Sequence, residues 1–584
     1  MRAFPRVAVG DAWVDPNDVA GFTRGVGQNA LTLTVHTFPS TRGVFRRNGR
    51  SGNRRVDRTV SFDTLVDLIA TRDRLRGECL PGNSLWLDPQ NDRKRVMVVV
   101  NPHAGNGRGV KVFEKDVAPV LRCAFADYPT RNDEETVNDV SSTPSPSRNE
   151  SRFDVLITQK RGDAFEHCVR LDLDLYAGVV CVGGDGTVAE VRNGILAQCG
   201  DDCELNKKGN LLPVGVVPTG SGNALAKSFS YATHTPCDAT SAALAVARGG
   251  WCFLDAADFD EVNEESLDEE TQNTHQKTKP AMRSLLSLSW GLFADIDIES
   301  ERCRWLGGAR FTAQAVVRIL FPRKYKGCVL RFKPLVMRDE ESIDADDVEI
   351  NNNGSSVRAA AARALVKGHA LSEIDNTNPE WRTLRLEKGN HIKGVFALNV
   401  PWATLAAHAA PGAAFHDGAF DVVVVKTASR LQMLRLLLSF ELGGHTEHRA
   451  VTYLKCVEFE LTPGVSDDGK GGYLVVDGEL VSRFGDEKKQ EGNDGKKNDS
   501  KKLLGNHQST ESGITVKHGS PDSWRVRYGP TKMRVTKGGA RVFIAGGGAR
   551  RGTRRRLTMG WFHKNKTHFG LMLLSRQLEF LLFD

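Results

Sequence analysis

Glycine-rich loops directly follow three apolar runs in the first half of the chain. Glycine lets backbone N–H groups approach a phosphate, and a helix that begins after such a loop adds favourable partial charge. A single loop of this kind is most often a plain turn. Three in series at equivalent places favour a nucleotide site. The runs with their loops are Val96–Val100 with Asn101–Gly109, Gly178–Val182 with Gly183–Thr187, and Val214–Val217 with Pro218–Asn223.

The middle loop carries an acid, Asp185, between two glycines that leave its carboxylate uncrowded. An Asp in a glycine-rich turn often only forms an Asx-turn. The flanking phosphate-type loops favour a catalytic use instead. The loops contain neither the Gly-x-x-x-x-Gly-Lys-Ser/Thr pattern of a P-loop nor a dinucleotide-binding Gly-x-Gly-x-x-Gly with a later ribose-binding acid. The site therefore belongs to another class of phosphate-binding site.

The elements around the loops indicate an α/β domain followed by a β-rich one. Val188, Val191 and Ile195 recur with helical spacing after the middle loop. Strand, loop and helix units in series are typical of a parallel sheet whose loops lie at the carboxyl ends of the strands. After Trp251 the pattern changes to short β-branched runs separated by turns, and we expect the active site where the two domains meet. These runs are Leu285–Trp290, Lys393–Val400, Ala419–Val425, Cys456–Leu461 and Tyr473–Val476.

Polar segments divide the 584-residue chain. We expect an N-terminal extension of unknown role at 1–92, an α/β nucleotide-binding domain at 93–250, a β-rich domain at 251–546 and a basic amphipathic tail at 547–584. Within the extension, Ala30–Thr34 suggests a strand and Asp63–Ala70 a short helix. The polar stretches are rich in Ser, Asn, Asp, Glu, Lys and Gly, which is typical of insertions without a packed core. They cover 131–152, 261–279, 338–357 and 486–518.

The composition excludes several classes of protein. Acidic and basic residues are both plentiful around a net charge of +7, and we expect no nucleic-acid partner. No apolar run approaches the ~20 residues that cross a bilayer, and the N-terminus lacks the pattern of a secretory signal, so we expect a cytoplasmic protein. The 11 cysteines suit reduced thiols, and the close pair Cys199 and Cys203 lacks partners for a zinc site.

Several motifs resemble the diacylglycerol-kinase catalytic superfamily and, within it, the sphingosine kinases. The segment 290–311 looks like the one that marks sphingosine kinases, and 476–479 looks like their last motif. Gly529–Phe543 looks like a closing segment that returns to the first domain. The superfamily's three nucleotide motifs match Asn101-Pro102-x-x-Gly105, Gly183-Gly184-Asp185-Gly186-x-x-x-Glu190-x-x-Asn193-Gly194 and Gly220-Ser221-Gly222-Asn223-Ala224-Leu225-Ala226.

This resemblance implies a fold, a reaction and a set of site residues. The fold is an α/β nucleotide-binding domain followed by a β-rich, sandwich-like lipid-binding domain, with the active site between them. Asp185 is the implied catalytic base, Ser287 and Asp297 lie near the lipid head group, and Mg²⁺ arrives with ATP rather than on a dedicated metal site. The implied nucleotide contacts are Asn101, Gly105, Thr158, Gly183, Gly184, Gly186, Ser221, Gly222, Arg304, Arg310 and Glu479.

The marking segment can also be interpreted from its residues alone. Strand-like alternation over Leu288–Ile298 would place Phe293, Asp295 and Asp297 on one face, beside a charged head group at the domain junction. The charges that follow suit an ordinary surface helix, with Glu299 and Arg302 as an i,i+3 pair and Glu301 as one more surface acid. We therefore assign a site role to Asp297 and none to Glu301.

The expected activity is transfer of the γ-phosphate of ATP to the primary hydroxyl of a sphingoid base such as sphingosine. Kinases for diacylglycerol or ceramide are the nearest alternatives, but their substrates carry no amine for Asp297. An NAD kinase would leave the motif that starts at Asn101 unexplained, and an inactive lipid-binding relative would not need Asp185 or Glu479. The clustered arginines of the tail suit peripheral binding to an anionic membrane. The preferred base and the oligomeric state cannot be read from the sequence.

Overall fold

The structure is a computed structural model. Most of the expected insertions, the tail at 547–584 and Cys203 lie outside the residues that it describes, so these expectations remain predictions. Among the described residues, no helix is both long and apolar enough to span a membrane. The described residues are 7–24, 31–39, 54–91, 94–125, 152–199, 212–262, 280–335, 374–375, 378, 380–386, 390–467, 469, 472–484, 524 and 526–545.

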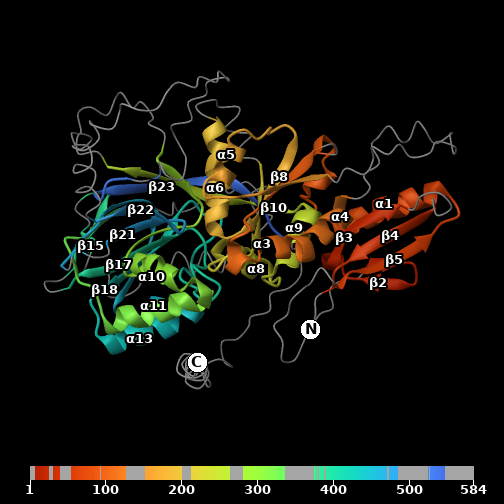
Figure 1. Cartoon of the computed structure of the whole chain (residues 1–584). Helices are drawn as coiled ribbons and strands as arrows, with labels where there is room; N and C mark the ends of the chain where they lie inside the picture. Colours follow the sequence, from red (N-terminus) through yellow and green to blue (C-terminus); the bar gives the residue numbers. More distant parts are fainter. Residues whose placement is uncertain are drawn as a thin grey trace, which may run out of the picture.

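The first domain is a parallel sheet in the order β7-β6-β8-β9, with helices on both faces (Figure 1). Its strands are buried β-branched runs, as expected for a sheet covered on both sides. The strands are β6 (Arg95–Val100), β7 (Phe153–Ile157), β8 (Tyr176–Gly183) and β9 (Val214–Pro218). The helices are α2 (Ala104–Gly107), α3 (Gly109–Val112), the π-helix η6 (Phe113–Val117), α4 (Ala118–Phe125), α5 (Asp163–Cys168), α6 (Asp185–Cys199), α8 (Ala224–Thr233) and α9 (Ala239–Arg248).

The second domain is β-rich, and the expected runs are confirmed as strands. The strands are β10 (Trp251–Glu261), β11 (Met282–Ser284), β12 (Ser287–Gly291), β13 (Tyr325–Lys326), β14 (Val329–Pro334), β15 (Ile374–Asp375), β16 (Arg382–Leu384), β17 (Ile392–Leu398), β18 (Phe420–Lys426), β19 (Val451–Thr462), β20 (Val465–Ser466), β21 (Tyr473–Val476), β22 (Glu479–Arg483) and β23 (Thr531–Phe543). The helices, which the turn-separated pattern did not predict, are α10 (Leu292–Ser300), η11 (Glu301–Leu306), α11 (Ala309–Leu320), α13 (Arg430–Ser439), η14 (Phe440–Leu442) and η15 (Gly444–Glu447).

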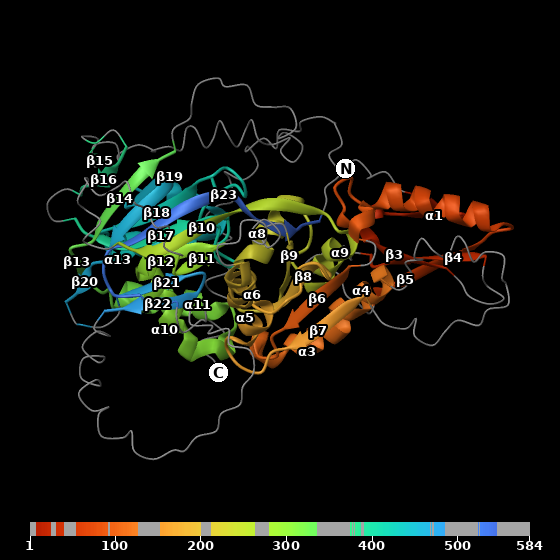
Figure 2. The ribbon, with the colours of Figure 1, turned by 90° about the horizontal axis from the view of Figure 1, so that it is seen from above.

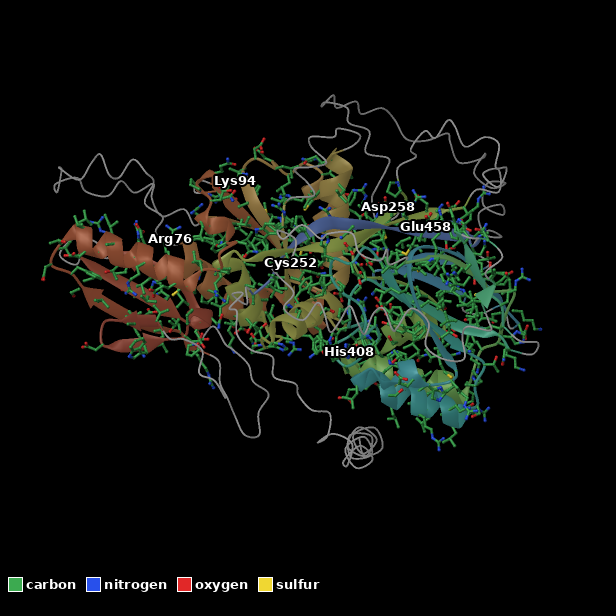
Figure 3. All side chains as sticks on the ribbon, turned by 180° about the vertical axis from the view of Figure 1, so that it is seen from behind. Arg76, Lys94, Cys252, Asp258, His408 and Glu458 are labelled. Carbon is green, nitrogen blue, oxygen red and sulfur yellow. The ribbon has the colours of Figure 1, made fainter. Side chains whose placement is uncertain are left out.

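Two long strands join the domains. β23 pairs in parallel with β9 of the first domain and antiparallel with β10 and β19 of the second. The predicted return of the closing segment to the first domain is thus confirmed. Within the described residues, one 16-stranded sheet therefore runs through both domains (Figure 2). Cys252 at the start of β10 lies near the centre of the molecule, whereas Asp258 lies in the second domain near Glu458 (Figure 3).

The N-terminal residues form a compact module of strands and one helix that lies against the first domain (Figures 1 and 2). Leu33 and Val35 of its sheet pack against Leu68 and Leu75 of α1. The indole of Trp86 donates to the carbonyl of Val246 at 2.9 Å, which ties the module to α9. The elements are β1 (Val7–Val9), β2 (Ala12–Val14), η1 (Pro16–Asp18), β3 (Val19–Arg24), β4 (Thr32–Thr37), β5 (Val56–Ser61), α1 (Leu65–Cys79), η4 (Leu85–Leu87) and η5 (Pro89–Asn91).

The expected strand over Leu288–Ile298 is wrong beyond its first half. β12 ends at Gly291, whose φ of 68° lies in the left-handed region, and α10 begins at the next residue. Glycine adopts this conformation without the steric cost that a Cβ would add. In a helix, side chains four residues apart share a face, whereas those two apart do not. Phe293 therefore still shares a side with Asp297, but Asp295 does not.

The β21–β22 hairpin is clamped to β12 by a buried carboxylate. Asp477 and Gly478 form its two-residue turn with φ of 51° and 83°, the geometry that favours an Asp-Gly pair. The Asp477 carboxylate accepts the hydroxyl of Ser284 at 2.5 Å and the N–H groups of residues 285, 286 and 287 at 2.8–3.0 Å. This clamp fixes where Glu479, the residue after the turn, enters β22.

We predict that Asp477→Asn lowers the free energy of unfolding by roughly 2–4 kcal/mol, because a neutral amide cannot accept all four donors and each hydrogen bond to a charged group is stabilising. Urea unfolding followed by tryptophan fluorescence measures the change. Asp467→Asn is the control, since the Asp467 side chain forms an exposed ion pair with Lys326, which is worth at most ~1 kcal/mol. Equal losses in the two variants would show that the clamp does not hold the hairpin.

Candidate active site

The three glycine-rich loops lie side by side at the carboxyl ends of β6, β8 and β9. The N–H of Asn101 donates to Val182 at 3.0 Å, and the N–H of Thr219 donates to Gly183 at 3.1 Å. The Asn101 amide also donates to the Thr187 hydroxyl at 3.3 Å. The first and third loops also approach each other closely at Gly105. Only glycine fits there, because a Cβ would lie 2.2 Å from the carbonyl oxygen of Thr219. The loops therefore form one surface of closely spaced backbone groups.

Asp185 lies at the centre of this surface and is held by the start of α8. The N–H groups of Ala224 and Leu225 donate to its two carboxylate oxygens at 3.0 and 3.1 Å. Gly222 passes so close that a Cβ there would lie 3.3 Å from the carboxylate. Burial raises the pKa of Asp185, while the backbone donors act in the opposite direction. The geometry thus presents an oriented carboxylate whose proton affinity is above that of an ordinary Asp.

The second domain contributes Glu479 to the same place. Its carboxylate lies over Gly186, where a Cβ would be 2.9 Å from it, and it accepts from Arg161 at 2.5 Å. Glu190 of α6 lies nearby, and it accepts the N–H of Gly162 at 3.1 Å. Burial raises the pKa of Glu190 to about 7, with the charge of Glu479 adding to the effect. The loops of the first domain and the β21–β22 hairpin therefore share one cluster of charged groups.

Two arginines enter the cluster, Arg304 from η11 and Arg310 from the start of α11. Arg304 and Arg310 both donate to Glu301, one to each carboxylate oxygen. Arg310 is buried, and its Nε has no hydrogen-bond partner within the described residues. The segment touches the nucleotide-type loops, since a Cβ on Gly308 would lie 3.5 Å from the carbonyl of Ser221. A buried guanidinium nitrogen without a partner suits a site that receives an anion.

Asp297 of α10 faces these charges. Burial raises its pKa to about 7, with Glu301, Glu479 and Asp185 adding to the effect and Arg310 opposing it. A carboxylate in this setting is costly to leave charged without a cation. The site thus holds more acidic than basic groups around Asp297, which favours a positively charged ligand.

The neighbouring acids of α10 lie elsewhere. Asp295 accepts the Tyr325 hydroxyl at 2.6 Å and lies 3.2 Å from Arg323, so the prediction that it stands beside Asp297 is wrong. Glu299 pairs with Arg318 at 3.1 Å and Arg323 at 2.5 Å rather than with Arg302. Helical geometry sends these side chains away from the site, which a strand-like interpretation could not show.

An apolar cluster continues from the Asp297 side of α10. Phe293, one turn before Asp297, has its ring centroid 4.9 Å from that of Phe396 in a tilted arrangement and 6.0 Å from that of Phe440. Met433 and Leu436 of α13 belong to the same cluster. Carboxylate and apolar side chains thus lie on one side of one helix, an arrangement that suits a ligand with a charged head and an apolar tail.

The remaining predicted residues occupy supporting positions. Thr158 follows β7 and donates its N–H to Val100 at 3.0 Å, directly before Asn101. Ser287 is buried in β12, and its N–H is one of the donors to Asp477. The predicted residues Gly183, Gly184 and Ser221 lie in the loops themselves. The sequence interpretation missed Arg161 and Glu301. A single charged residue in a polar stretch of sequence does not show which distant residue it pairs with in the fold.

The described residues include no group of three or more His, Cys, Asp or Glu side chains that could hold a metal ion on its own. The carboxylates of Asp185 and Glu479 are nevertheless hard oxygen donors near the loops, the type of ligand that Mg²⁺ takes together with phosphate oxygens. The residues present are therefore compatible with a magnesium ion that is bound mainly by a nucleotide.

Two family models match the chain. Residues 95–252 match the diacylglycerol kinase catalytic domain. Residues 343–489 match the YegS C-terminal NAD kinase beta sandwich-like domain. The two matches follow the order of the α/β and β-rich domains seen in the structure.

Curated relatives extend the similarity across most of the chain. Sphingosine kinase 1 of Arabidopsis thaliana is 33% identical over 67% of this chain and 69% of its own length. Sphingosine kinase 2 of the same plant is 30% identical over 74% of this chain and 77% of its own length. Ceramide kinase of Homo sapiens is 24% identical over 59% and 57% of the two chains. With its glycine-rich loops, its hairpin glutamate and this level of identity, the chain belongs to the sphingosine kinase family of lipid kinases, within the diacylglycerol kinase catalytic superfamily.

Proposed function

We propose that this chain transfers the γ-phosphate of ATP to the primary hydroxyl of sphingosine or a related sphingoid base, giving sphingosine 1-phosphate and ADP. The observation that carries the proposal is the position of Asp297. Asp297 interacts electrostatically with Asp185 and Glu479, and it lies one helical turn after Phe293, which packs against an apolar cluster. A sphingoid base offers a protonated amine, a hydroxyl and a hydrocarbon chain, which match these three features in turn.

ATP binds through the loops and the arginines. Backbone N–H groups of the three loops face the phosphates, with Asn101, Gly105 and Ser221 at the loop positions nearest to them. Arg304 and Arg310 neutralise the phosphate charge, and the unpartnered Nε of Arg310 gains an acceptor. Mg²⁺ arrives with ATP and offsets the charge that develops on the phosphate oxygens.

Asp185 acts on the acceptor hydroxyl. Because phosphoryl transfer has a loose transition state, positioning and charge neutralisation supply most of the catalysis. The oriented carboxylate of Asp185 accepts a hydrogen bond from the primary hydroxyl and takes its proton as the hydroxyl oxygen bonds to the γ-phosphorus and the bond to ADP breaks. The pKa of Asp185, raised by burial, makes the carboxylate a better base than an exposed Asp.

A kinase for diacylglycerol or ceramide is the alternative, since a ceramide kinase is among the relatives. Neither lipid carries an amine. The Asp297 carboxylate, whose pKa is raised by burial and by the charges of three other acids, would then gain no cationic partner from the lipid. The charge around Asp297 therefore favours the sphingoid base.

We also propose that the protein works in the cytoplasm and docks on an anionic membrane through α11 and α13, which lie side by side at one edge of the molecule (Figure 1). These two helices, together with the residues that directly follow them, expose apolar stripes: Phe321 after α11 is 70% exposed, and Leu442 at the end of η14 is 72% exposed. Exposed basic residues flank the stripes, which suits a negatively charged lipid surface. The apolar stripes are Val317, Leu320 and Phe321, and Leu431, Leu438 and Leu442; the basic residues are Lys324, Arg430 and Arg435.

Asp185→Asn is expected to reduce turnover by roughly 10²–10⁴-fold, because the amide keeps the size of the side chain but cannot take the proton. Binding of a non-hydrolysable ATP analogue should stay within a few-fold of the parent. Rapid-quench phosphorylation of sphingosine and analogue binding measure the two effects. A folded variant with near-normal turnover would remove Asp185 from the mechanism.

Asp297→Asn is expected to raise the apparent KM for sphingosine by roughly two to four orders of magnitude, the cost of breaking a buried ion pair, with little change for ATP. In the parent, binding should strengthen from pH 6 to pH 8, because the carboxylate, whose pKa is raised to about 7, is neutral below that pH and charged above it. The variant should lack this dependence. Asp295→Asn is the matched control, since Asp295 lies on the same helix but away from the site, and an equal loss there would contradict the assignment.

The double variant Leu320→Ser with Phe321→Ser should partition onto anionic vesicles at least about tenfold more weakly than the parent, because two apolar side chains no longer enter the bilayer. Vesicle co-sedimentation at low salt measures this. Val66→Ser is the control, since Val66 is an equally exposed apolar residue on α1. If only deletion of residues 547–584 weakens binding, the tail rather than α11 and α13 is the docking element.

A further inference from the structure

Glu301 occupies both arginines that the proposed function assigns to ATP. One of its oxygens accepts from Arg304 and the other from Arg310, while the segment that carries all three residues contacts the nucleotide-type loops. A carboxylate that bridges two guanidinium groups presents them with the same kind of planar, charged acceptor as a phosphate. The ATP phosphates and Glu301 therefore compete for the two guanidinium groups.

The charge of Glu301 acts on neighbouring acids of the site, and this effect becomes stronger when the two arginines leave Glu301 for the phosphates. Glu301 contributes to the raised pKa of both Asp297 and Glu479, so it lies within electrostatic range of the position expected for the lipid amine. While Arg304 and Arg310 hold Glu301, they neutralise it. Once they turn to the phosphates, Glu301 becomes an uncompensated anion within electrostatic range of Asp297. The attraction of the site for a cation then increases.

We propose that Glu301 is a placeholder for the ATP phosphates and that its release couples ATP binding to binding of the amine-bearing lipid. Before ATP binds, Glu301 keeps the buried Arg310 oriented and paired, which avoids the cost of an isolated buried charge. After ATP binds, the freed carboxylate adds to Asp297 in holding the ammonium group. Glu301 is thus a positioning residue, and the inference rests on the proposed function only for the identity of the second ligand.

The chain supplies a closely matched comparison. Glu299, two residues earlier, also bridges two arginines, Arg318 and Arg323, but this network lies with Asp295 on the side of α10 away from Asp297. Replacing Glu299 removes a bridging carboxylate of the same type without touching the nucleotide side. Any effect special to Glu301 must therefore come from its place in the site.

The experiment measures ligand binding in Glu301→Gln, Glu299→Gln and the parent, using the full chain. The first quantity is the Kd of a magnesium-loaded non-hydrolysable ATP analogue without lipid. Glu301→Gln should bind it roughly two- to fivefold more tightly, since the competing ion pair is gone. The second is the ratio of the Kd values for sphingosine in mixed micelles without and with the analogue. This ratio should be about five or more in the parent and near one in Glu301→Gln.

Glu299→Gln should resemble the parent in both quantities, and thermal melting checks that each variant is folded. Weaker analogue binding by Glu301→Gln, or a coupling ratio that it leaves unchanged, would overturn the placeholder role. A parent that does not bind sphingosine contradicts the proposed function instead. In that case the Kd of the ATP analogue without lipid is the deciding measurement. Tighter analogue binding by Glu301→Gln supports the placeholder role of Glu301, and unchanged binding contradicts it.

Discussion

The pairing of β23 with strands of both domains is the constraint on which the rest of the structure depends. Asp185 and the glycine loops come from the first domain, whereas Asp297, Glu301, Arg310 and Glu479 come from the second. These side chains meet because one sheet continues through β9, β23 and β19 and leaves the two halves no independent orientation. The hydrogen bonds of Asp477 to Ser284 and Ser287 then fix the position of the hairpin, and with it the position of Glu479 in the site.

The parts of this arrangement that depend on local chemistry could be predicted from the sequence. Buried β-branched runs predicted the strands, and glycines at their ends predicted the loops, because a close backbone approach such as that of Gly105 to Thr219 tolerates no Cβ. The same reasoning failed at Leu292–Ser300, where alternating apolar residues are compatible with both strand and helix. A left-handed glycine, Gly291, decides between them, and one glycine gives too little signal to locate that change.

The long-range ion pairs could not be predicted. Glu301 looked like a surface acid because its partners lie three residues later in η11 and nine residues later in α11, and Arg161 meets Glu479 across 318 positions of the chain. The charge pattern becomes meaningful only in three dimensions, where several acids surround Asp297 with Arg310 as the buried counter-charge. This imbalance explains how one site can bind an anionic nucleotide at one end and a cationic lipid at the other.

The most direct test of the central claim is a comparison of acceptors that differ only at the amine. Phosphorylation of sphingosine and of its N-acylated form should be measured with ATP and Mg²⁺, with diacylglycerol and NAD beside them. If Asp297 recognises a protonated amine, removing that charge should lower kcat/KM by roughly 10²–10⁴-fold. Diacylglycerol and NAD should be poor acceptors. Equal use of the N-acylated lipid, or a preference for diacylglycerol, would contradict recognition of a sphingoid base.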